Sequence, residues 1–458
     1  MPRTGSDQSC RSVLNTLEQT GAVLRVREEI DPVHDIAALL SLVDGTAVII
    51  ERVKGCEIGV FSGLLTSLER IAQVLGTKPS LVVDHILSSV LAPVAPVLVD
   101  TAPVQQIVET ENVLTNLPVP TFFEQETGPY ITAGLIVARD PETGLGNASY
   151  ARIKVLGPRE AMIGIAPNHH LAIMARKAAA QGEPLPFAVV LGAHPAIQLA
   201  ACLYLGLGDD EMHCAGALLG EPVRLVRAQS LDLDVPAEAE IVLEGHIHVD
   251  EPIVEGVVSE YHGMYENYGS GMRASFQCQT RRSDAMMQVI EPGYHREHLF
   301  LAAVPIAASL KAVLSRVILN VGQVAVTLSG SGRTNVVVQI DTPRPGQARR
   351  AMMACWGAVS IVKNVTVVDS DVDPWDLEAV EFAKMTRMRA ERDVLIIPGL
   401  PTDRSEPLED GGVIAKIGYD ATRRAGDRKL GFDKARPPEA ALKRMGALLA
   451  KHHPGHEL

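Results

Sequence analysis

The middle third of the chain is the part that most constrains the fold, because it is rich in short runs of β-type residues. From about residue 105, Pro118 and Pro120 interrupt the chain, and one clear helix is predicted over 171–181. Strands are predicted around this helix, over 134–138, 149–155 and 188–191. Short β-type runs bounded by turn residues are typical of sheet domains. We therefore expect a barrel-like sheet at the centre.

The flanking regions alternate between helices and strands. Before the middle third, the patterns predict a helix over 12–19 that stops at Gly21, a strand over 22–26, a helix that begins at Asp31-Pro32 and a strand over 47–50. After residue 300, strands are predicted over 324–328, 335–340, 365–368 and 394–397, with helices between them. The fold class expected from these patterns is α/β (α+β).

Composition excludes several classes of protein. The 458 residues are 47% hydrophobic, which is typical of a globular chain with two or three domains. The net charge of −13 argues against a nucleic-acid surface. The apolar segment Ile86–Val99 contains Pro93 and Pro96 and is too short to cross a membrane. We expect a cytoplasmic protein, because the N-terminus lacks the apolar core of a signal peptide and the six scattered cysteines form no CxxC pair.

Two glutamates five residues apart are the strongest candidates for chemistry. Glu255 and Glu260 lie in a Gly-rich turn between a β-type run and several aromatic residues. Each has apolar or small neighbours, which favours partial burial and a raised pKa. Two such carboxylates suit acid–base chemistry, although a structural hydrogen-bonding pair is the more frequent role of such residues.

Three other clusters contain residues that suit a metal or a cofactor. Asn147, Ser149 and Arg152 open a predicted strand, and alternation places Arg152 on the opposite face from the other two unless a bulge intervenes. The pair His169-His170 stands at a helix start, and the acidic loop Leu207–His213 precedes a small-residue helix expected near Ala215. Amide, imidazole and carboxylate ligands suit manganese or magnesium better than zinc. Taken singly, a histidine near a helix start is more often a capping or core residue, and an acidic loop is more often a solvated helix cap.

Another segment has a composition that suggests a site but lacks the residues that would complete it. Ser329-Gly-Ser-Gly-Arg333 has no Gly-Lys-Ser/Thr of a phosphate loop, so we interpret it as a hairpin or strand connection.

Read together and in order, the clusters resemble the UbiD family of decarboxylases, which use prenylated FMN. The resemblance covers nearly the whole chain. It rests on Gly21-Ala-Val-Leu-Arg-Val-Arg-Glu-Glu-Ile-Asp-Pro32, Gly216-Ala-Leu-Leu-Gly-Glu-Pro-Val-Arg-Leu-Val226, Val235-Pro-Ala-Glu-Ala-Glu-Ile-Val-Leu-Glu-Gly245, Glu255-Gly-Val-Val-Ser-Glu260 and Asp410-Gly-Gly-Val-Ile-Ala-Lys-Ile-Gly-Tyr-Asp-Ala-Thr422.

The resemblance implies three regions: an N-terminal α/β region over 1–105, a split β-barrel that binds prenylated FMN over 106–302, and a C-terminal α/β domain over 303–458 with an oligomerising C-terminal helix. It also implies a homodimer or a higher homo-oligomer, and no membrane or nucleic-acid partner.

The resemblance assigns roles to residues that match the family's motifs. Arg152, Glu255 and Glu260 match its catalytic Glu-Arg-Glu network, with Glu260 as the proton donor. The expected metal ligands are Asn147, His169 and Glu211, which would hold Mn²⁺ or Mg²⁺ against the cofactor phosphate with K⁺ beside it. The expected cofactor contacts are Asn147, Ser149, Ala151, Arg152, Asn168, His169, Ala201, Cys202, Leu203, Glu211 and Lys416.

The activity implied is reversible, non-oxidative decarboxylation of an aromatic, heteroaromatic or α,β-unsaturated carboxylic acid through a covalent adduct with prenylated FMN. A cofactor is needed because no side chain can delocalise the electrons left on an sp² carbon. The implied partners are the small-molecule acid and a flavin prenyltransferase that supplies the cofactor. The alternatives are an FMN-dependent reductase-like enzyme and a non-catalytic UbiD-like subunit.

This chain departs from the commoner family pattern at two places. Many members have Glu-Gly-Pro-Phe/Met-Gly-Glu where this chain has Glu255-Gly-Val-Val-Ser-Glu260, so the turn lacks a proline and a glycine. A Ser-Ser-Met-Pro of some relatives is Ala201-Cys-Leu-Tyr204 here. Both changes concern the expected site.

Overall fold

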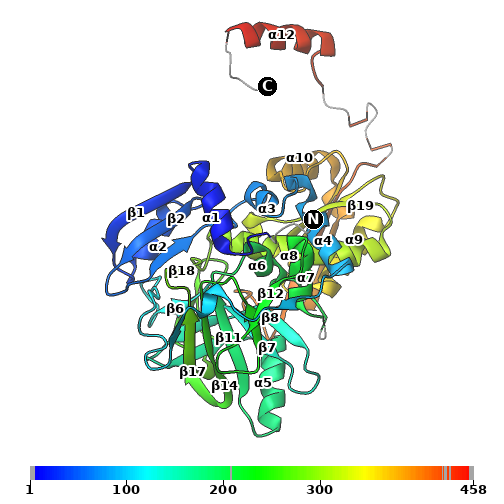
Figure 1. The fold of residues 1–458 in the computed structure, drawn as a ribbon. Helices are drawn as coiled ribbons and strands as arrows, with labels where there is room; N and C mark the ends of the chain where they lie inside the picture. The colour runs from blue at the N-terminus through cyan, green and yellow to red at the C-terminus, as the bar shows by residue number, and fades with distance from the viewer. Residues whose placement is uncertain (1–5, 207–208, 425, 428–430, 433–434, 453–458) are drawn as a thin grey trace.

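The protein is described from a computed structural model that covers residues 6–206, 209–424, 426–427, 431–432 and 435–452. Figure 1 shows an N-terminal region, a central sheet and a C-terminal sheet joined by a long helix, α8 (Arg296–Val317). The expected mixed α/β class is confirmed.

The N-terminal region packs helices on a small sheet. Its sheet has the order β1-β2-β3-β18, in which β18 (Met286–Gln288) arrives from much later in the chain. The other elements are α1 (Cys10–Gln19), β1 (Val23–Ile30), α2 (Asp35–Leu42), β2 (Ala47–Val53), β3 (Gly59–Ser62), α3 (Leu68–Val74), a 3₁₀ turn η1 (Pro79–Leu81) and α4 (Val82–Leu91).

The prediction of a helix start at Asp31-Pro32 is wrong. The helix α2 begins at Asp35, after His34 at a φ of 71°. The backbone of Pro32 and His34 is instead hydrogen-bonded to Thr121, which draws this segment out of the helix and onto the central region.

The central region is an antiparallel sheet with the order β6-β9-β10-β17-β14-β11-β7-β8, and β5 pairs with β17. The path of hydrogen bonds ends at β6 and β8, so the sheet is open rather than a closed barrel. Its strands are β5 (Ile107–Glu109), β6 (Tyr130–Ile131), β7 (Leu135–Arg139), β8 (Gly146–Tyr150), β9 (Arg152–Val155), β10 (Glu160–Gly164), β11 (Leu185–Leu191), β14 (Ile241–Val254) and β17 (Ser270–Arg281).

The other elements of the central region are β4 (Val97–Leu98), a 3₁₀ turn η2 (Pro103–Gln105), α5 (His170–Ala180), α6 (Pro195–Ala200), α7 (Glu211–Leu219), β12 (Arg224–Arg227), β13 (Asp234–Pro236), β15 (Val258–Ser259) and β16 (Tyr265–Glu266). Of these, α5 packs on β8, β11 and β14, and α7 packs on β8. The predicted helix 171–181 is confirmed as α5. The helix expected near Ala215 begins earlier, at Glu211, because Asp210 caps it through the N–H of Met212. Leu207 and Gly208 lie outside the described residues.

The C-terminal sheet has the order β19-β20-β21-β23-β22, and β20, β21 and β23 are parallel. Its elements are β19 (Val321–Val326), η3 (Leu328–Gly330), β20 (Asn335–Ile340), α9 (Gln347–Ala358), β21 (Asn364–Asp369), α10 (Leu377–Arg387), α11 (Ala390–Asp393), β22 (Val394–Pro401) and β23 (Val413–Ala421). The segment Ser329–Arg333 connects the antiparallel strands β19 and β20, as predicted. The last helix, α12 (Glu439–His452), stands apart from these layers in Figure 1.

The helix α8 holds the regions together. Over the described residues it is the one helix long and apolar enough to cross a membrane, but 61% of its apolar window is buried inside the protein. It packs against α4, α6, α9 and β19. Near its start, the buried Glu297 carboxylate accepts hydrogen bonds of 2.6 Å from the N–H groups of Gly63 and Leu64. These contacts identify α8 as a core helix that anchors the N-terminal sheet.

Candidate active site

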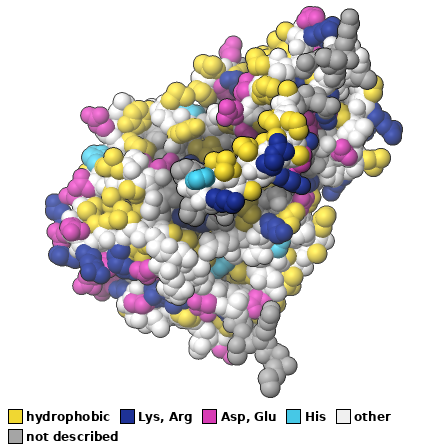
Figure 2. All heavy atoms as spheres, turned by 90° about the horizontal axis from the view of Figure 1, so that it is seen from above, with side chains coloured by type: hydrophobic (Ala, Val, Ile, Leu, Met, Phe, Trp, Pro, Cys, Tyr) yellow, Lys and Arg dark blue, Asp and Glu magenta, His cyan; other side chains and the backbone are white. Residues whose placement is uncertain are grey.

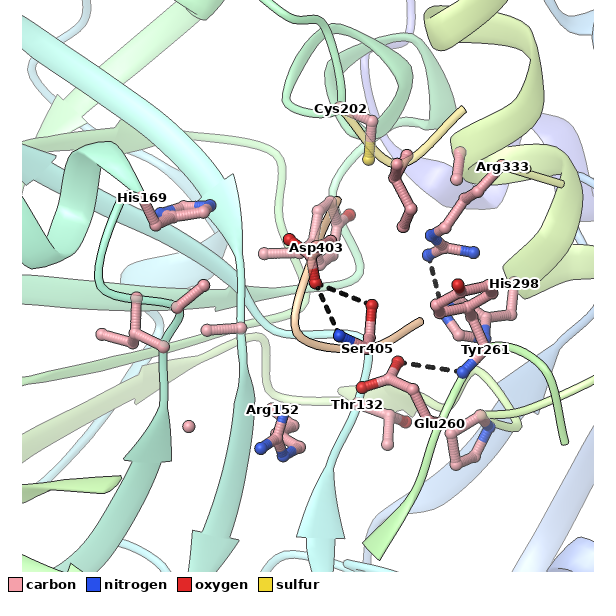
Figure 3. Close-up of a pocket in the computed structure, with 18 of the residues that line it drawn as sticks. Thr132, Arg152, His169, Cys202, Glu260, Tyr261, His298, Arg333, Asp403 and Ser405 are labelled. Carbon is pink, nitrogen blue, oxygen red and sulfur yellow. Dashed lines mark hydrogen bonds between the residues drawn. The ribbon is translucent and has the colours of Figure 1, made fainter. Parts of the chain in front are cut away.

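A cavity of about 340 Å³ lies where the central sheet meets α8 and the C-terminal sheet. Its wall is formed by the junction of β8 and β9, the turn before β17, the first turns of α8, and loops near residues 333, 361 and 403. Figure 3 shows polar side chains from these separate elements pointing into this one space. Basic side chains also gather near a hollow on the face seen in Figure 2, although the chain carries a net charge of −13.

Arg152 lines this cavity and forms a tight ion pair with the buried Glu255. Arg152 Nε and Nη2 donate to the two Glu255 carboxylate oxygens at 2.5 and 2.6 Å. The Glu255 side chain is 1% exposed and that of Arg152 is 20% exposed. The carboxylate raises the pKa of Arg152 against the opposing effect of burial. Gly164 faces Arg152 across the sheet, where an added Cβ would lie 2.8 Å from the guanidinium carbon. The predicted partnership of these two residues is therefore present.

Arg152 reaches the cavity because the predicted strand 149–155 is broken. The chain forms β8 up to Tyr150 and β9 from Arg152, so Ala151 interrupts the alternation. Consequently Tyr150, Ala151 and Arg152 all line the cavity, whereas simple alternation would have turned Tyr150 and Arg152 away from Ala151.

The turn between the two glutamates is held by neighbours that the sequence pattern did not reveal. The buried Lys154 Nζ donates to the backbone oxygen of Glu255 at 2.7 Å and to Thr127 Oγ1 at 2.5 Å. Gly256 has a φ of +85°, and a Cβ there would lie 2.8 Å from Thr127 Oγ1. Lys154 and Thr127 therefore position Glu255 in a turn that lacks the proline of other sequences.

Glu260 faces the same cavity as Arg152. One oxygen accepts from the N–H of Tyr261 at 2.9 Å, and the other accepts from the Tyr268 hydroxyl at 2.9 Å. The Tyr268 ring also lies 4.9 Å from the Arg152 guanidinium and 4.5 Å from that of Arg404. Burial, with Glu260 next to it, raises the pKa of Tyr268 well above its usual range, so the hydroxyl remains a donor. This arrangement can hold or release a proton at Glu260 beside a cation.

Two of the three expected metal ligands are in contact. Asn147 Nδ2 donates to Glu211 Oε1 at 3.2 Å, and the N–H of Ala148 donates to Glu211 Oε2 at 2.8 Å. Burial raises the pKa of Glu211 to about 7, and it lowers the pKa of His169 to about 4. His169 lines the main cavity, whereas Asn147 lines a smaller neighbouring one. Within the described part of the chain, no three His, Cys, Asp or Glu side chains are grouped so that they could hold a metal ion. The expected set contains only two residues of these types, because Asn147 would contribute an amide oxygen.

The other expected cofactor residues are distributed around the cavity. Ala151 and Cys202 line it, and Asn168 lines an adjoining space of about 390 Å³. Ser149 is buried and donates to Asn147 Oδ1 at 3.3 Å, while Ala201 and Leu203 are buried next to Cys202.

Lys416 lies outside the residues that line the main cavity. It is buried, and its Nζ donates to the Ser360 backbone oxygen at 2.5 Å, one residue from the cavity residue Ile361. Burial lowers its pKa to about 8.

Sequence reasoning missed several residues that the tertiary structure brings to the cavity, namely Tyr268, His298, Arg333 and Arg404. Tyr268 stands close to the glutamate turn in sequence and could have been found there. His298 and Arg404 come from distant segments with no local motif, so no sequence signal pointed to them. Arg333 ends the segment Ser329–Arg333, which the sequence pattern identified only as a hairpin or strand connection.

Comparisons with known families cover most of the chain. Three family models match, each described as a domain of 3-octaprenyl-4-hydroxybenzoate carboxy-lyase. The UbiD N-terminal domain matches residues 14–90, the UbiD Rift-related domain matches 97–295, and the UbiD C-terminal domain matches 299–421.

A curated relative and two solved structures are also similar. The anhydromevalonate phosphate decarboxylase of Methanosarcina mazei is 30% identical, over 94% of this chain and 99% of the relative. The UbiD-class enzyme HmfF of Pelotomaculum thermopropionicum in complex with FMN is 36% identical, with a TM-score of 0.91 over 96% of this chain and 99% of HmfF. An evolved dimeric form of HmfF in complex with prFMN is 36% identical, with a TM-score of 0.87 over 95% of this chain and 98% of that one.

Proposed function

The chain belongs to the UbiD family and is a carboxy-lyase of that class, and from this premise we propose its reaction and the roles of its residues. The reaction is the reversible, non-oxidative decarboxylation of an aromatic, heteroaromatic or α,β-unsaturated carboxylic acid with prenylated FMN as cofactor. The observation that carries the proposal is that Arg152, held by the buried Glu255, lines the same cavity as Glu260.

Each of these three residues has a distinct part. When bound, prenylated FMN supplies an electron sink for the pair left by carbon dioxide. Arg152 positions the substrate carboxylate, and Glu255 holds the guanidinium in place through two hydrogen bonds. Glu260 donates a proton to the carbon that loses carbon dioxide, and in the reverse direction it accepts that proton.

The residues around the cavity fit the cofactor and its metal. Asn147, His169 and Glu211 would hold Mn²⁺ or Mg²⁺, with K⁺ beside it. The Glu211 carboxylate is buried with only N–H donors against it, and such a group gains from a cation. The lowered pKa of His169 keeps its imidazole neutral, as a metal ligand must be. Contacts to the flavin would come from Ser149, Ala151, Asn168, Ala201, Cys202, Leu203 and Lys416.

The remaining proposals concern the setting of the enzyme. The regions 1–105, 106–302 and 303–458 would act as the N-terminal, cofactor-binding and C-terminal units, and α8 runs across the last boundary. The exposed apolar residues of α12, such as Leu442 and Met445, suit a homodimer or a higher homo-oligomer. A cytoplasmic flavin prenyltransferase would supply the cofactor.

Co-expression with a flavin prenyltransferase tests the proposal. The mass and absorbance of the bound flavin should be those of prenylated FMN, and carbon dioxide should be released from at least one acid in a panel of phenolic, furan, pyrrole, polycyclic and acrylic acids. Plain FMN would favour a reductase-like enzyme, and an empty protein would favour a non-catalytic subunit.

A substitution of the proton donor tests the assignment of Glu260. We expect Glu260→Gln to abolish turnover while the flavin is retained, because the amide keeps the shape of the side chain but cannot deliver the proton. Loss of flavin from Glu260→Gln would instead give Glu260 a structural role.

A further inference from the structure

Arg333 projects into the cavity from the connection between β19 and β20, far in sequence from the catalytic glutamates. Ser331 and Gly332 have positive φ values of 52° and 67°. A Cβ on Gly332 would lie 2.6 Å from the backbone oxygen of Leu299, so the connection packs directly on α8. This close approach sets the point from which Arg333 reaches inward.

Two side chains hold the Arg333 guanidinium in place. Arg333 Nη2 donates to His298 Nε2 at 3.1 Å, and the guanidinium carbon lies 4.7 Å from the centre of the Tyr261 ring. His298 Nδ1 lies 3.0 Å from the backbone oxygen of Gly293, which makes Nδ1 the protonated nitrogen and Nε2 the acceptor. Burial and the Arg333 charge lower the pKa of His298 to about 3, so the imidazole stays neutral. Arg333 is therefore oriented by neutral groups.

Arg333 differs from Arg152 because it has no carboxylate partner among the residues that the structure describes. Neither Glu260 nor Asp403, the two carboxylates that line the cavity, forms an ion pair with Arg333, and both accept hydrogen bonds from other donors. Glu260 accepts from Tyr261 and Tyr268, and Asp403 accepts from the N–H and hydroxyl of Ser405 at 3.0 and 2.7 Å. A guanidinium in a partly buried wall without a counter-charge is costly unless an anion binds it.

The position of Arg333 indicates which ligand supplies that anion. In Figure 3, Arg333 lies across the cavity from His169, which we assign to the metal at the cofactor phosphate. It lies instead on the side of Tyr261, the residue that follows Glu260. An anion at Arg333 would therefore lie on the Tyr261 side of the cavity, away from His169.

We propose that Arg333 binds a second oxyanion of the substrate, so that the enzyme prefers acids with another carboxylate or a phosphate ester besides the carboxylate that is lost. The inference rests on the proposed function and names its substrate class. The guanidinium fork matches both kinds of oxyanion, and neutral His298 and Tyr261 orient it without competing charge.

Binding to the holoenzyme tests this subsite apart from turnover. In a Glu260→Gln background, calorimetry would compare benzene-1,4-dicarboxylate with benzoate, and 4-phosphonooxybenzoate with 4-hydroxybenzoate. We expect the dianionic member of at least one pair to bind more tightly, and Arg333→Gln to lower that preference by at least about 30-fold. The pair that shows the preference distinguishes a carboxylate from a phosphate ester.

Matched variants separate recognition from general charge effects. Arg333→Lys should retain part of the preference, because it keeps the charge but loses the fork. Arg27→Gln removes an arginine that is 78% exposed on β1 and should leave the preference unchanged. Equal binding of both members of each pair, or an unchanged preference in Arg333→Gln, would overturn the inference. If binding depends on Arg333 but the holoenzyme with Glu260 intact releases no carbon dioxide from these acids, the proposed reaction alone would be overturned.

Discussion

The Arg152–Glu255 pair gives the sharpest prediction, because its two members are unequally buried. Replacing Arg152 with Met leaves a carboxylate that is 1% exposed without its counter-charge. Replacing both residues with Met removes the charge as well as its partner. We therefore expect Arg152→Met alone to destabilise the fold strongly, and the double variant Arg152→Met/Glu255→Met to recover most of the lost stability.

The expected size follows from burial. Breaking a buried pair by removing one partner costs about 3–5 kcal/mol, and the lower end applies here because Arg152 is 20% exposed to the cavity. An unfolding entropy of about 2.1 cal/mol/K per residue gives roughly 1 kcal/mol/K for the 458 residues. Arg152→Met should then lower Tm by about 3 °C if the chain unfolds as one unit, and by more if the central region unfolds alone. Glu255→Met should cost less, since the remaining Arg152 charge reaches water.

Thermal unfolding of the wild type, both single variants and the double variant measures the coupling between the residues. The flavin content of all four proteins must be matched, because a ligand of the folded state raises Tm. The double variant should unfold within about 1 °C of the wild type. If its loss of Tm equals the sum of the two single losses, the residues do not interact and the reasoning is refuted. All three variants should be inactive, so activity alone cannot replace the measurement.

Further outcomes can be checked on the same protein. His169→Ala should lose bound metal and flavin, as measured by elemental analysis and absorbance, and full occupancy would contradict its role as a ligand. Tyr268→Phe should lower kcat about tenfold with unchanged flavin content, because Glu260 loses a hydroxyl donor worth roughly 1.5 kcal/mol while the ring remains against Arg152. The free energy of unfolding should fall as the pH drops below about 6.5. In this range His298 becomes protonated in the unfolded chain, whereas burial keeps it neutral in the folded protein down to about pH 3. Chemical unfolding at several pH values should show that the free energy of unfolding of His298→Gln falls less steeply with pH than that of the wild type, by up to about 1.4 kcal/mol per pH unit. Identical slopes for the two proteins would refute this.

The sequence predicted helices and strands well where the apolar residues recur with a single period, either that of a helix or that of a strand. The strand 335–340 matches β20, and the helix 171–181 matches α5 within one residue. Prediction failed where a distant segment competes for the backbone. Thr121 takes the hydrogen bonds of Pro32 and His34, and the interruption at Ala151 splits one expected strand into two. Periodicity reports only neighbours along the chain, so it cannot show such contacts.

The sequence by itself determined the family, through motifs whose order spans the chain, and with the family it determined the class of reaction. It also identified Arg152, Glu255 and Glu260 as a group. Only the tertiary structure decided how Arg152 reaches Glu255 and that Tyr268 binds Glu260, because these contacts depend on a broken strand and on a turn held by Lys154. The same holds for Arg333, whose sequence context is an ordinary strand connection. Its place in the cavity follows from the packing of Gly332 on α8, which no spacing along the chain records.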